Sequence, residues 1–320
     1  MAVYTEIEDD ALIEFVDAYD IGEVLSCKGI AEGIENSNFI VTTTSGPYIL
    51  TLYEKRVSIE DLPFFLGLMD HAAANGIPCP VPLRTQGGET LRELADRPAA
   101  LVSFLPGMWP RRPTASHCRQ VGEALARFHL AADGFHLKRA NALGPDAWRG
   151  LLEASGDDAN QVKTGLAGIL DATLDGLLDA WPGDLPMGVI HADLFPDNVF
   201  FRAEHLSGMI DFYFACNDQL AYDVAVCLNA WCFEPDLSFN VTKARRFLRG
   251  YQDVRALTDA EIAAMPVLAQ GAAMRFLLTR LYDWLHTPED AFVTPKSPIE
   301  YVKKLEFHQG VKGPESYGID

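Results

Sequence analysis

The sequence has few cysteines, few basic residues and no uninterrupted apolar run of membrane-spanning length. Its six cysteines form no C-x-x-C pair, which is typical of a reduced protein with core cysteines and argues against a zinc site. The N-terminal residues are acidic and lack the basic and apolar segments of a signal peptide. We therefore expect a soluble, cytoplasmic protein.

Positive charge is also scarce, because 26 Lys and Arg residues face 45 Asp and Glu residues, a net charge of −19. This balance argues against nucleic acid or an anionic membrane as a partner. A nucleotide stays possible, because a metal ion and a few local cations are enough to balance its phosphates. With 320 residues and 48% hydrophobic content, the chain is expected to form one large or two modest domains.

The stretch with the clearest chemistry is a polar loop at residues 191–198, between the apolar segments 189–190 and 199–201. A turn and a second short apolar segment, 209–210, follow it. A loop followed by such a hairpin can bring four polar side chains together: His191, Asp193, Asn198 and Asp211.

Phosphoryl transfer needs such a set of side chains. The carboxylate of Asp193 can orient an attacking hydroxyl and take its proton. The amide oxygen of Asn198 and the carboxylate of Asp211 can hold Mg²⁺, which prefers oxygen ligands and keeps several waters. The other interpretation is a polar loop between two buried strands.

The first third of the chain predicts a small sheet with one main helix. The pattern favours helices at 9–19 and 61–76, the second begun by a capping box at Ser58–Asp61. Strands are expected at 21–25, 39–43, 48–53 and 99–104, and a hairpin of 81–85 with 89–94 around Gly87 and Gly88.

From Thr114 onward the pattern is mostly helical, so we expect a boundary at residues 106–107. It separates an N-terminal lobe, 1–105, from a C-terminal lobe, 106–320. Residues 135–148 are expected to be a loop, and His129 a core histidine. Helices are predicted at 158–181, 221–232 and 266–285, with capping boxes at Thr258–Glu261 and Ser297–Glu300.

The segment from Gly29 to Asn38 carries two glycines and two asparagines between strands. Backbone N–H groups in such a loop can approach phosphate oxygens. With the polar cluster at 191–211 present, we expect a nucleotide-covering loop that includes Gly33, Asn36, Ser37 and Asn38; the alternative is a plain hairpin loop.

The spacing His-x-Asp-x4-Asn, followed by Asp211-Phe-Tyr after an apolar strand, resembles the catalytic and metal-binding loops of kinase-like phosphotransferases. Together with the order of the two lobes, it resembles the aminoglycoside-phosphotransferase-like family of small-molecule kinases. Within that superfamily, four segments look like the homoserine kinases: residues 50–55, 191–198, 211–216 and 222–232.

The resemblance implies an α+β, protein-kinase-like fold with two lobes. It also implies ATP-dependent phosphorylation of the hydroxyl of L-homoserine to O-phosphohomoserine, a step of threonine biosynthesis, with ATP and Mg²⁺ as cofactors. Asp193 would be the catalytic base and His191 would brace the loop. Asn198 and Asp211 would be the Mg²⁺ ligands.

Two further roles follow from the same resemblance. The backbone from Ser103 to Leu105 would form the hinge that reads adenine. Asp223 would support the catalytic loop from the helix that follows it.

One departure concerns the third strand, where the family has a Lys that pairs with ATP phosphates and with a helix Glu. Here Thr51 holds that position, and the predicted helix after Asp61 carries no Glu. Lys28, Lys55 or Arg56 is a candidate for the missing cation. A nucleotide-binding pseudokinase is therefore one alternative function.

A small amino-acid substrate needs a cation for its carboxylate and an anion for its ammonium group. The candidate cations are Arg139, Arg275 and Arg280, and the candidate anions are Asp218 and Asp283. Each of these also has an ordinary interpretation as a surface or stabilising charge.

A second alternative is a kinase for choline, ethanolamine, an aminoglycoside or methylthioribose. A choline site requires an aromatic cage for its quaternary ammonium group. The candidate cage residues are Phe212, Tyr213, Phe214 and Trp231.

The metal assignment generates the first testable prediction. Asp211→Ala should abolish turnover and weaken the binding of Mg·ATP more than that of free ATP, because only the metal-bound form uses this carboxylate. Binding titrations with and without Mg²⁺ measure the difference. Equal weakening of both forms would assign Asp211 a structural role.

Overall fold

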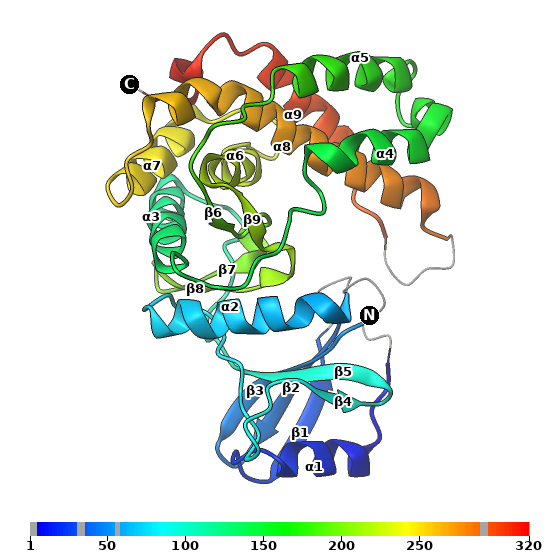
Figure 1. The fold of residues 1–320 in the computed structure, drawn as a ribbon, viewed down its shortest axis with the longest axis vertical. Coiled ribbons are helices and arrows are strands. Elements are labelled where there is room, and N and C mark those ends of the chain that lie inside the picture. The colour runs from blue at the N-terminus through cyan, green and yellow to red at the C-terminus, as the bar shows by residue number, and fades with distance from the viewer. Residues whose placement is uncertain (1–4, 31–35, 55–57, 289–293, 320) are drawn as a thin grey trace. The chain divides into compact units, whose positions relative to one another are not determined.

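The structure, a computed structural model, describes residues 5–30, 36–54, 58–288 and 294–319. The chain divides into two compact units. Figure 1 colours the chain by residue number, so most of the smaller unit is blue to cyan. The smaller unit comprises Met1–Pro106 and Gly208–Tyr213, and the larger comprises Gly107–Ser207 and Phe214–Asp320. The segment Gly208–Tyr213 lies in the range that the sequence alone assigned to the C-terminal lobe.

The smaller unit is built on an antiparallel sheet of five strands in the order β1-β2-β3-β5-β4. Residues of β2 alternate between buried and half-buried, so the sheet has one apolar face. The strands are β1 (Val24–Gly29), β2 (Ser37–Thr43), β3 (Gly46–Leu52), β4 (Arg92–Leu94) and β5 (Arg97–Ser103).

Two helices accompany this sheet. Helix α1 (Asp9–Asp17) buries Leu12, Phe15 and Val16 in one cluster with the apolar face of the sheet. Helix α2 (Leu62–Ala74) carries Pro63 in its first turn, as expected, where the missing N–H costs nothing. The predicted fold class, a small antiparallel sheet followed by a mostly helical part, is confirmed.

The predicted turn around Gly87 and Gly88 forms, since Thr85 N donates to Glu89 O at 2.8 Å, but the predicted pairing of strands 81–85 and 89–94 is wrong. Strand β4 pairs instead with β5 through a two-residue turn at Ala95 and Asp96, both at positive φ. Residues 81–83 lie along the other part of β5, where Leu83 N donates to Leu101 O at 2.8 Å. Because Pro80 and Pro82 lack an N–H, this segment cannot form a full ladder.

Two of the three predicted capping boxes do not form. The Ser58 hydroxyl donates to Glu60, and a 3₁₀ turn, Ile59–Asp61, precedes α2. Helix α9 (Ile299–Gln309) begins without a side-chain cap, because Glu300 accepts from Arg280 and from Lys304 instead.

The larger unit consists of helices around two short antiparallel sheets, β6–β9 and β7–β8 (Figure 1). Its strands are β6 (Met187–Ile190), β7 (Val199–Arg202), β8 (His205–Met209), whose last two residues belong to the smaller unit, and β9 (Cys216–Gln219). Besides α9, its helices are α3 (Ala115–Ala131), α4 (Pro145–Ser155), α5 (Leu166–Asp179), α6 (Leu220–Trp231), α7 (Val241–Gln252) and α8 (Asp259–His286).

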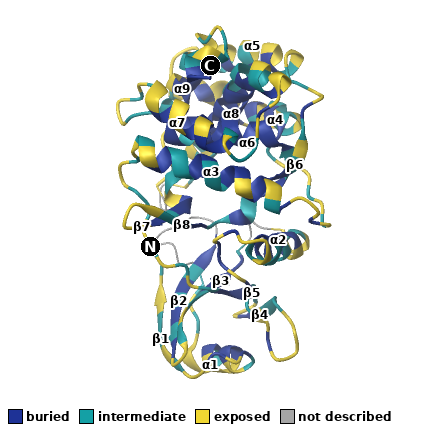
Figure 2. Ribbon diagram, turned by 90° about the vertical axis from the view of Figure 1, so that its left-hand side faces the viewer, coloured by how far each residue is buried: buried dark blue, intermediate teal, exposed yellow. Residues whose placement is uncertain are grey.

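Helix α8 is the long core helix of this unit. It is capped by the predicted box at Thr258 and Glu261, but it begins at Asp259 and runs through Pro266 instead of starting there. By length and composition alone it could span a membrane, yet 61% of its most apolar window is buried inside the protein. Figure 2 shows α6 buried along most of its length, and in α8 the buried residues lie mainly between Leu268 and Leu281.

Other differences from the sequence prediction lie in this unit. Helix α4 begins at Pro145, inside the expected loop 135–148, and the arginine-rich helix α7 was not predicted. The expected helix at 158–181 is divided at Gly165, whose φ of +77° belongs to the left-handed region. A 3₁₀ segment, Gly156–Gln161, precedes α5.

Helices α3 and α7 approach each other closely at two glycines. A Cβ atom at Gly122 would lie 2.1 Å from the carbonyl oxygen of Phe247. A Cβ atom at Gly250 would lie 2.1 Å from the carbonyl oxygen of Arg119. Because the obstacle is backbone in both cases, only a shift of a whole helix could admit a larger residue.

Gly122→Ala should therefore destabilise the protein by about 2–3 kcal/mol, the range of overpacking in a close-packed core. Gly168→Ala on α5 is the matched control, because nothing lies within 4 Å of its added Cβ. The control should be neutral or stabilising by up to about 1 kcal/mol. Urea unfolding of both variants measures the difference, and equal effects would contradict the close approach.

Candidate active site

The polar loop at residues 191–198 connects β6 to β7 in the larger unit. Ladder pairs join β6 to β9, with Ile190 opposite Cys216, so the loop leaves a sheet that is buried at this end. Ala192 has a φ of +61°, a left-handed conformation that a residue with a Cβ adopts only when its surroundings impose it. A 3₁₀ turn, Pro196–Asn198, closes the loop.

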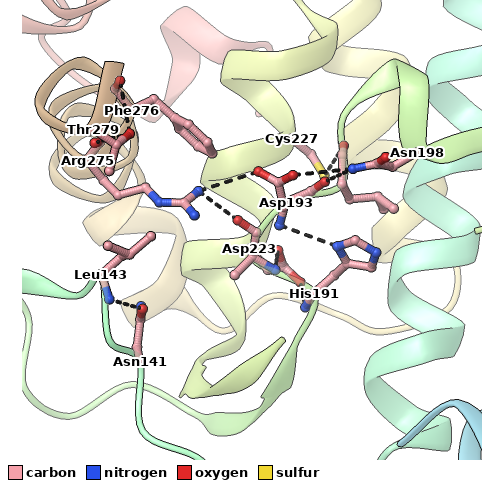
Figure 3. Close-up of polar contacts among 12 residues, drawn as sticks. Asn141, Leu143, His191, Asp193, Asn198, Asp223, Cys227, Arg275, Phe276 and Thr279 are labelled. Carbon is pink, nitrogen blue, oxygen red and sulfur yellow. Dashed lines mark hydrogen bonds and ion pairs between the residues drawn. The ribbon is translucent and has the colours of Figure 1, made fainter. Parts of the chain in front are cut away.

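The carboxylate of Asp223 on α6 imposes that conformation. It accepts hydrogen bonds from His191 N at 2.7 Å and from Ala192 N at 2.9 Å (Figure 3). Asp223 is fully buried. Burial raises its pKa, but the hydrogen bond and charge of His129 and the donors of the loop more than offset burial, so the pKa lies below 3.8. The predicted support of the loop from the following helix is therefore present.

His129 supplies the third contact to this carboxylate. Its Nε2 lies 3.1 Å from Asp223 Oδ2, and its Nδ1 lies 2.8 Å from the hydroxyl oxygen of Tyr251 on α7. Because an ionised carboxylate only accepts hydrogen bonds, Nε2 donates to Asp223. His129 is the core histidine that the sequence indicated, and the partner that sequence reasoning missed is Tyr251, which lies on the unpredicted helix. The apolar spacing of α7 at Ala244, Phe247 and Leu248 was the signal for that helix.

The loop holds Asp193 and Asn198 against each other. Asn198 Nδ2 donates to Asp193 O at 2.8 Å and lies 3.3 Å from Asp193 Oδ2. His191 Nδ1 accepts from Asp193 N at 3.3 Å, so the predicted bracing by His191 runs through the backbone. Because the amide nitrogen of Asn198 is bonded to Asp193, the amide oxygen of Asn198 is the atom that can bind another ligand.

Arg275 on α8 reaches the same loop. Its guanidinium donates to Ala192 O at 2.9 Å and lies 3.7 Å from Asp193 Oδ1 (Figure 3). It stacks on the ring of Phe276 at 3.9 Å and is only 4% exposed. Burial raises the pKa of Asp193 above its ordinary value, and the charges of Arg275 and His191 offset that rise only in part. Arg275 thus stabilises the ionised form of the carboxylate.

The other candidate substrate charges have different surroundings. Arg280 pairs with Glu300 at 2.6 Å and lies 4.5 Å from the ring centre of Tyr301, so its charge is neutralised between α8 and α9. Arg139 NH1 donates to Ala215 O at 3.2 Å. Asp218 on β9 accepts from Asn141 Nδ2 at 2.7 Å.

In the smaller unit, the predicted nucleotide loop lies partly outside the described residues, and so do Gly33, Lys55 and Arg56. Asn36 Oδ1 accepts from Glu54 N at 3.3 Å, and the Ser37 hydroxyl donates to Glu54 at 2.7 Å.

Position 51 on β3 is polar and buried. The Thr51 hydroxyl donates to Asn38 Oδ1 at 2.7 Å, and Thr51 lies directly opposite Asn38 in the ladder. Lys28 is an exposed residue of β1.

Three more predicted residues lie in the smaller unit. Ser103 N donates to Val81 O at 2.9 Å, so this amide already has a partner. Asp211 follows β8 with a φ of +65°. The Tyr213 hydroxyl lies 3.2 Å from that of Tyr53, and burial raises the pKa of Tyr213 to about 12.

No group of three or more His, Cys, Asp or Glu side chains within the described residues is placed to hold a metal ion. A Mg²⁺ site needs fewer protein ligands, because this ion is usually held by one or two carboxylates, substrate phosphates and water. Asn198 and Asp211 offer oxygen atoms, which fit that preference.

Comparison with known proteins gives the class. A family model described as "Phosphotransferase enzyme family" matches residues 26–257. The chain belongs to this phosphotransferase family. Proteins named homoserine kinase from Rhodospirillum rubrum and Rhizobium johnstonii are each 61% identical to it over 319 residues, covering 100% of this chain and 99% of each relative. The resemblance stated from the sequence is confirmed.

Solved structures share the fold. An amicoumacin kinase superposes with a TM-score of 0.72 at 16% identity, covering 96% of this chain and 95% of its own. A microcompartment-associated aminopropanol kinase gives a TM-score of 0.69 at 18% identity, covering 95% of both chains. These likenesses concern the fold alone, and they confirm the predicted kinase-like architecture.

The site analysis predicts that Asp223→Asn destabilises the protein by about 3 kcal/mol at pH 7, because the loop donors and His129 lose a buried charged acceptor. Asp175→Asn, at a carboxylate whose side chain is 67% exposed, should change stability by less than about 0.5 kcal/mol. Urea unfolding measures both.

The pH dependence of that difference follows from the lowered pKa of Asp223. A depressed pKa adds stability at pH values above the unfolded-state pKa, and this stability is lost as the pH falls through the folded-state pKa. The gap between wild type and Asp223→Asn should therefore be constant near neutrality and shrink below about pH 4. A gap that widens on acidification would contradict the assignment.

Proposed function

We propose that this protein transfers the γ-phosphoryl group of ATP to the side-chain hydroxyl of L-homoserine, giving O-phosphohomoserine. The observation that carries the substrate is the identity to homoserine kinases along the whole chain. The contacts of the catalytic loop support the reaction type, because they hold a carboxylate where an acceptor hydroxyl can be oriented.

In this proposal Asp193 binds the homoserine hydroxyl and accepts its proton as the bond to phosphorus forms. Phosphoryl transfer passes through a loose transition state, so positioning counts for more than strong basicity. Arg275 and Asn198 fix the two carboxylate oxygens from opposite sides. His191 and Asp223 keep the loop backbone in place through hydrogen bonds to its N–H groups.

Asn198 and Asp211 are the proposed ligands of Mg²⁺, which when bound neutralises charge on the β- and γ-phosphates. The amide nitrogen of Asn198 is held by Asp193, which leaves its oxygen for the ion. The carboxylate of Asp211 is the second oxygen donor. Asn198 belongs to the larger unit, and Asp211 belongs to the smaller unit.

Nucleotide binding is assigned to the smaller unit. The main chain from Ser103 to Leu105 reads adenine, and because Ser103 N is already bonded to Val81, Leu105 supplies the amide donor. The segment that contains Gly33 and Asn36, together with Ser37 and Asn38 at the start of β2, covers the phosphates. Lys28, Lys55 or Arg56 takes the place of the missing lysine at Thr51.

A choline-type kinase is the weaker candidate. Of the four rings proposed for an aromatic cage, Phe212 and Trp231 are at most 1% exposed, and Trp231 Nε1 donates to Leu194 O at 2.7 Å. Such rings are core residues and offer no surface to a quaternary ammonium group.

A panel of homoserine, choline, ethanolamine, serine, methylthioribose and kanamycin, read as ADP release, tests the substrate. Homoserine should give the highest kcat/KM. A higher kcat/KM for another alcohol would identify that alcohol as the substrate in place of homoserine. The absence of turnover with every alcohol would favour the pseudokinase alternative.

Asp193→Asn should lower kcat for homoserine by roughly 10²–10⁴, the usual contribution of a general base. ATP affinity should change little, because Asp193 does not contact the nucleotide in this proposal. Kinetics and a Mg·ATP titration on the same variant measure the two quantities.

Asp197→Asn is the matched control within the same loop. Asp197 is 52% exposed and lies 3.8 Å from Lys296, so its loss should leave kcat within about threefold of wild type. Near-wild-type kcat for Asp193→Asn together with a large loss for Asp197→Asn would move the base to Asp197.

A further inference from the structure

Asp218 is a half-buried carboxylate on β9, in the sheet that leads into the catalytic loop. Its ladder partner is Gly188, and the next pair but one, Ile190 with Cys216, immediately precedes His191. Asp218 Oδ2 accepts from Asn141 Nδ2 at 2.7 Å, and Oδ1 accepts from Gln219 N at 2.7 Å. A carboxylate has about four acceptor positions, so these two bonds orient it without exhausting it.

Within the described part of the chain, Asp218 has no ion-pair partner. Burial raises its pKa, its two hydrogen bonds lower it, and the charge of Asp223 raises it. No cation among the residues that the structure describes offsets that desolvation. The other carboxylates of this region are occupied, because Asp223 accepts three hydrogen bonds and Asp193 lies beside Arg275.

Asp218 shares its surroundings with the catalytic loop. The hydroxyl of Tyr222 is buried without a hydrogen-bond partner. Burial raises its pKa, Arg275 lowers it and Asp218 raises it, so both charges act on this one hydroxyl. The thiol of Cys216 has a pKa raised to about 12 by burial and by the charges of Asp218 and Asp223, while Arg139 and Arg275 lower it. Arg275 is also the residue that lies 3.7 Å from Asp193 Oδ1.

We propose that Asp218, oriented by Asn141, binds the ammonium group of the amino-acid substrate and so selects amino alcohols with a free amine. The proposal rests on the proposed function, since it names how that site recognises homoserine. An ammonium group brings both the charge and the donors that Asp218 lacks, and Asp218 lies in the sheet that leads into the loop carrying Asp193. Asp283, the other candidate of the sequence, lies on α8 and is not part of this sheet.

The test compares two substrates that differ only in the ammonium group: L-homoserine and 4-hydroxybutyrate. Asp218→Asn should lower kcat/KM for homoserine by about 10- to 100-fold, the range for a hydrogen bond to a charged group. The loss should lie mainly in KM. For 4-hydroxybutyrate, kcat/KM should change by less than about threefold, because this substrate has no ammonium group to bind the carboxylate of Asp218.

Where 4-hydroxybutyrate turnover is too slow to measure, its competitive inhibition constant against homoserine serves instead and should be the same in both enzymes. Asn141→Ala keeps the carboxylate but removes its orienting bond, and it should give a smaller loss that is again selective for homoserine. Asp175→Asn, at an exposed carboxylate, is the control and should alter neither substrate.

Equal losses for both substrates, or an unchanged kcat/KM for homoserine in Asp218→Asn, would overturn the inference and leave Asp218 as a structural link to residue 141. These outcomes differ from failure of the proposed function. That failure would appear in the wild-type protein, as ADP release that does not depend on homoserine.

Discussion

The catalytic loop of the larger unit depends on one buried negative charge. Asp223 accepts two backbone N–H groups of the loop and one ring N–H of His129. An isolated buried carboxylate is unfavourable, so it persists only because these donors satisfy it. The same donors, in turn, hold Ala192 in a left-handed conformation that it would not adopt alone. The conformation of the loop and the ionisation of Asp223 therefore depend on each other, because the same hydrogen bonds stabilise both.

This interaction is fixed by helix packing at a distance from the loop. Gly122 and Gly250 let α3 and α7 meet backbone to backbone, which brings Tyr251 to His129. His129 then carries the contact to Asp223. The addition of a single methyl group at the helix crossing would thus alter the hydrogen bonds that support the loop, because close-packed helices have no free space for it and must shift.

The charged residues around the site differ in how completely their charges are paired, and this difference separates structural from chemical roles. Arg280 is neutralised by Glu300, and Asp223 is fully occupied, so both stabilise the unit. Arg275 and Asp193 form a longer pair of 3.7 Å, which leaves Asp193 available to a hydroxyl. Asp218 has no counterion among the described residues, and in our proposal the ammonium group of the substrate takes that place.

The sequence by itself determined the class of the fold and picked out the polar loop at residues 191–198, because these rest on local spacing and on the apolar pattern of single elements. The support of that loop by Asp223 was implied by the family resemblance, and the structure shows its hydrogen bonds. It did not determine that β4 pairs with β5, or that Tyr251 completes the support of the loop. Strand pairing and buried hydrogen bonds join residues far apart in the chain, so no local pattern records them. Tertiary structure also decided which candidate arginine lies beside Asp193, since side-chain charge is visible in a sequence whereas its counterion is not.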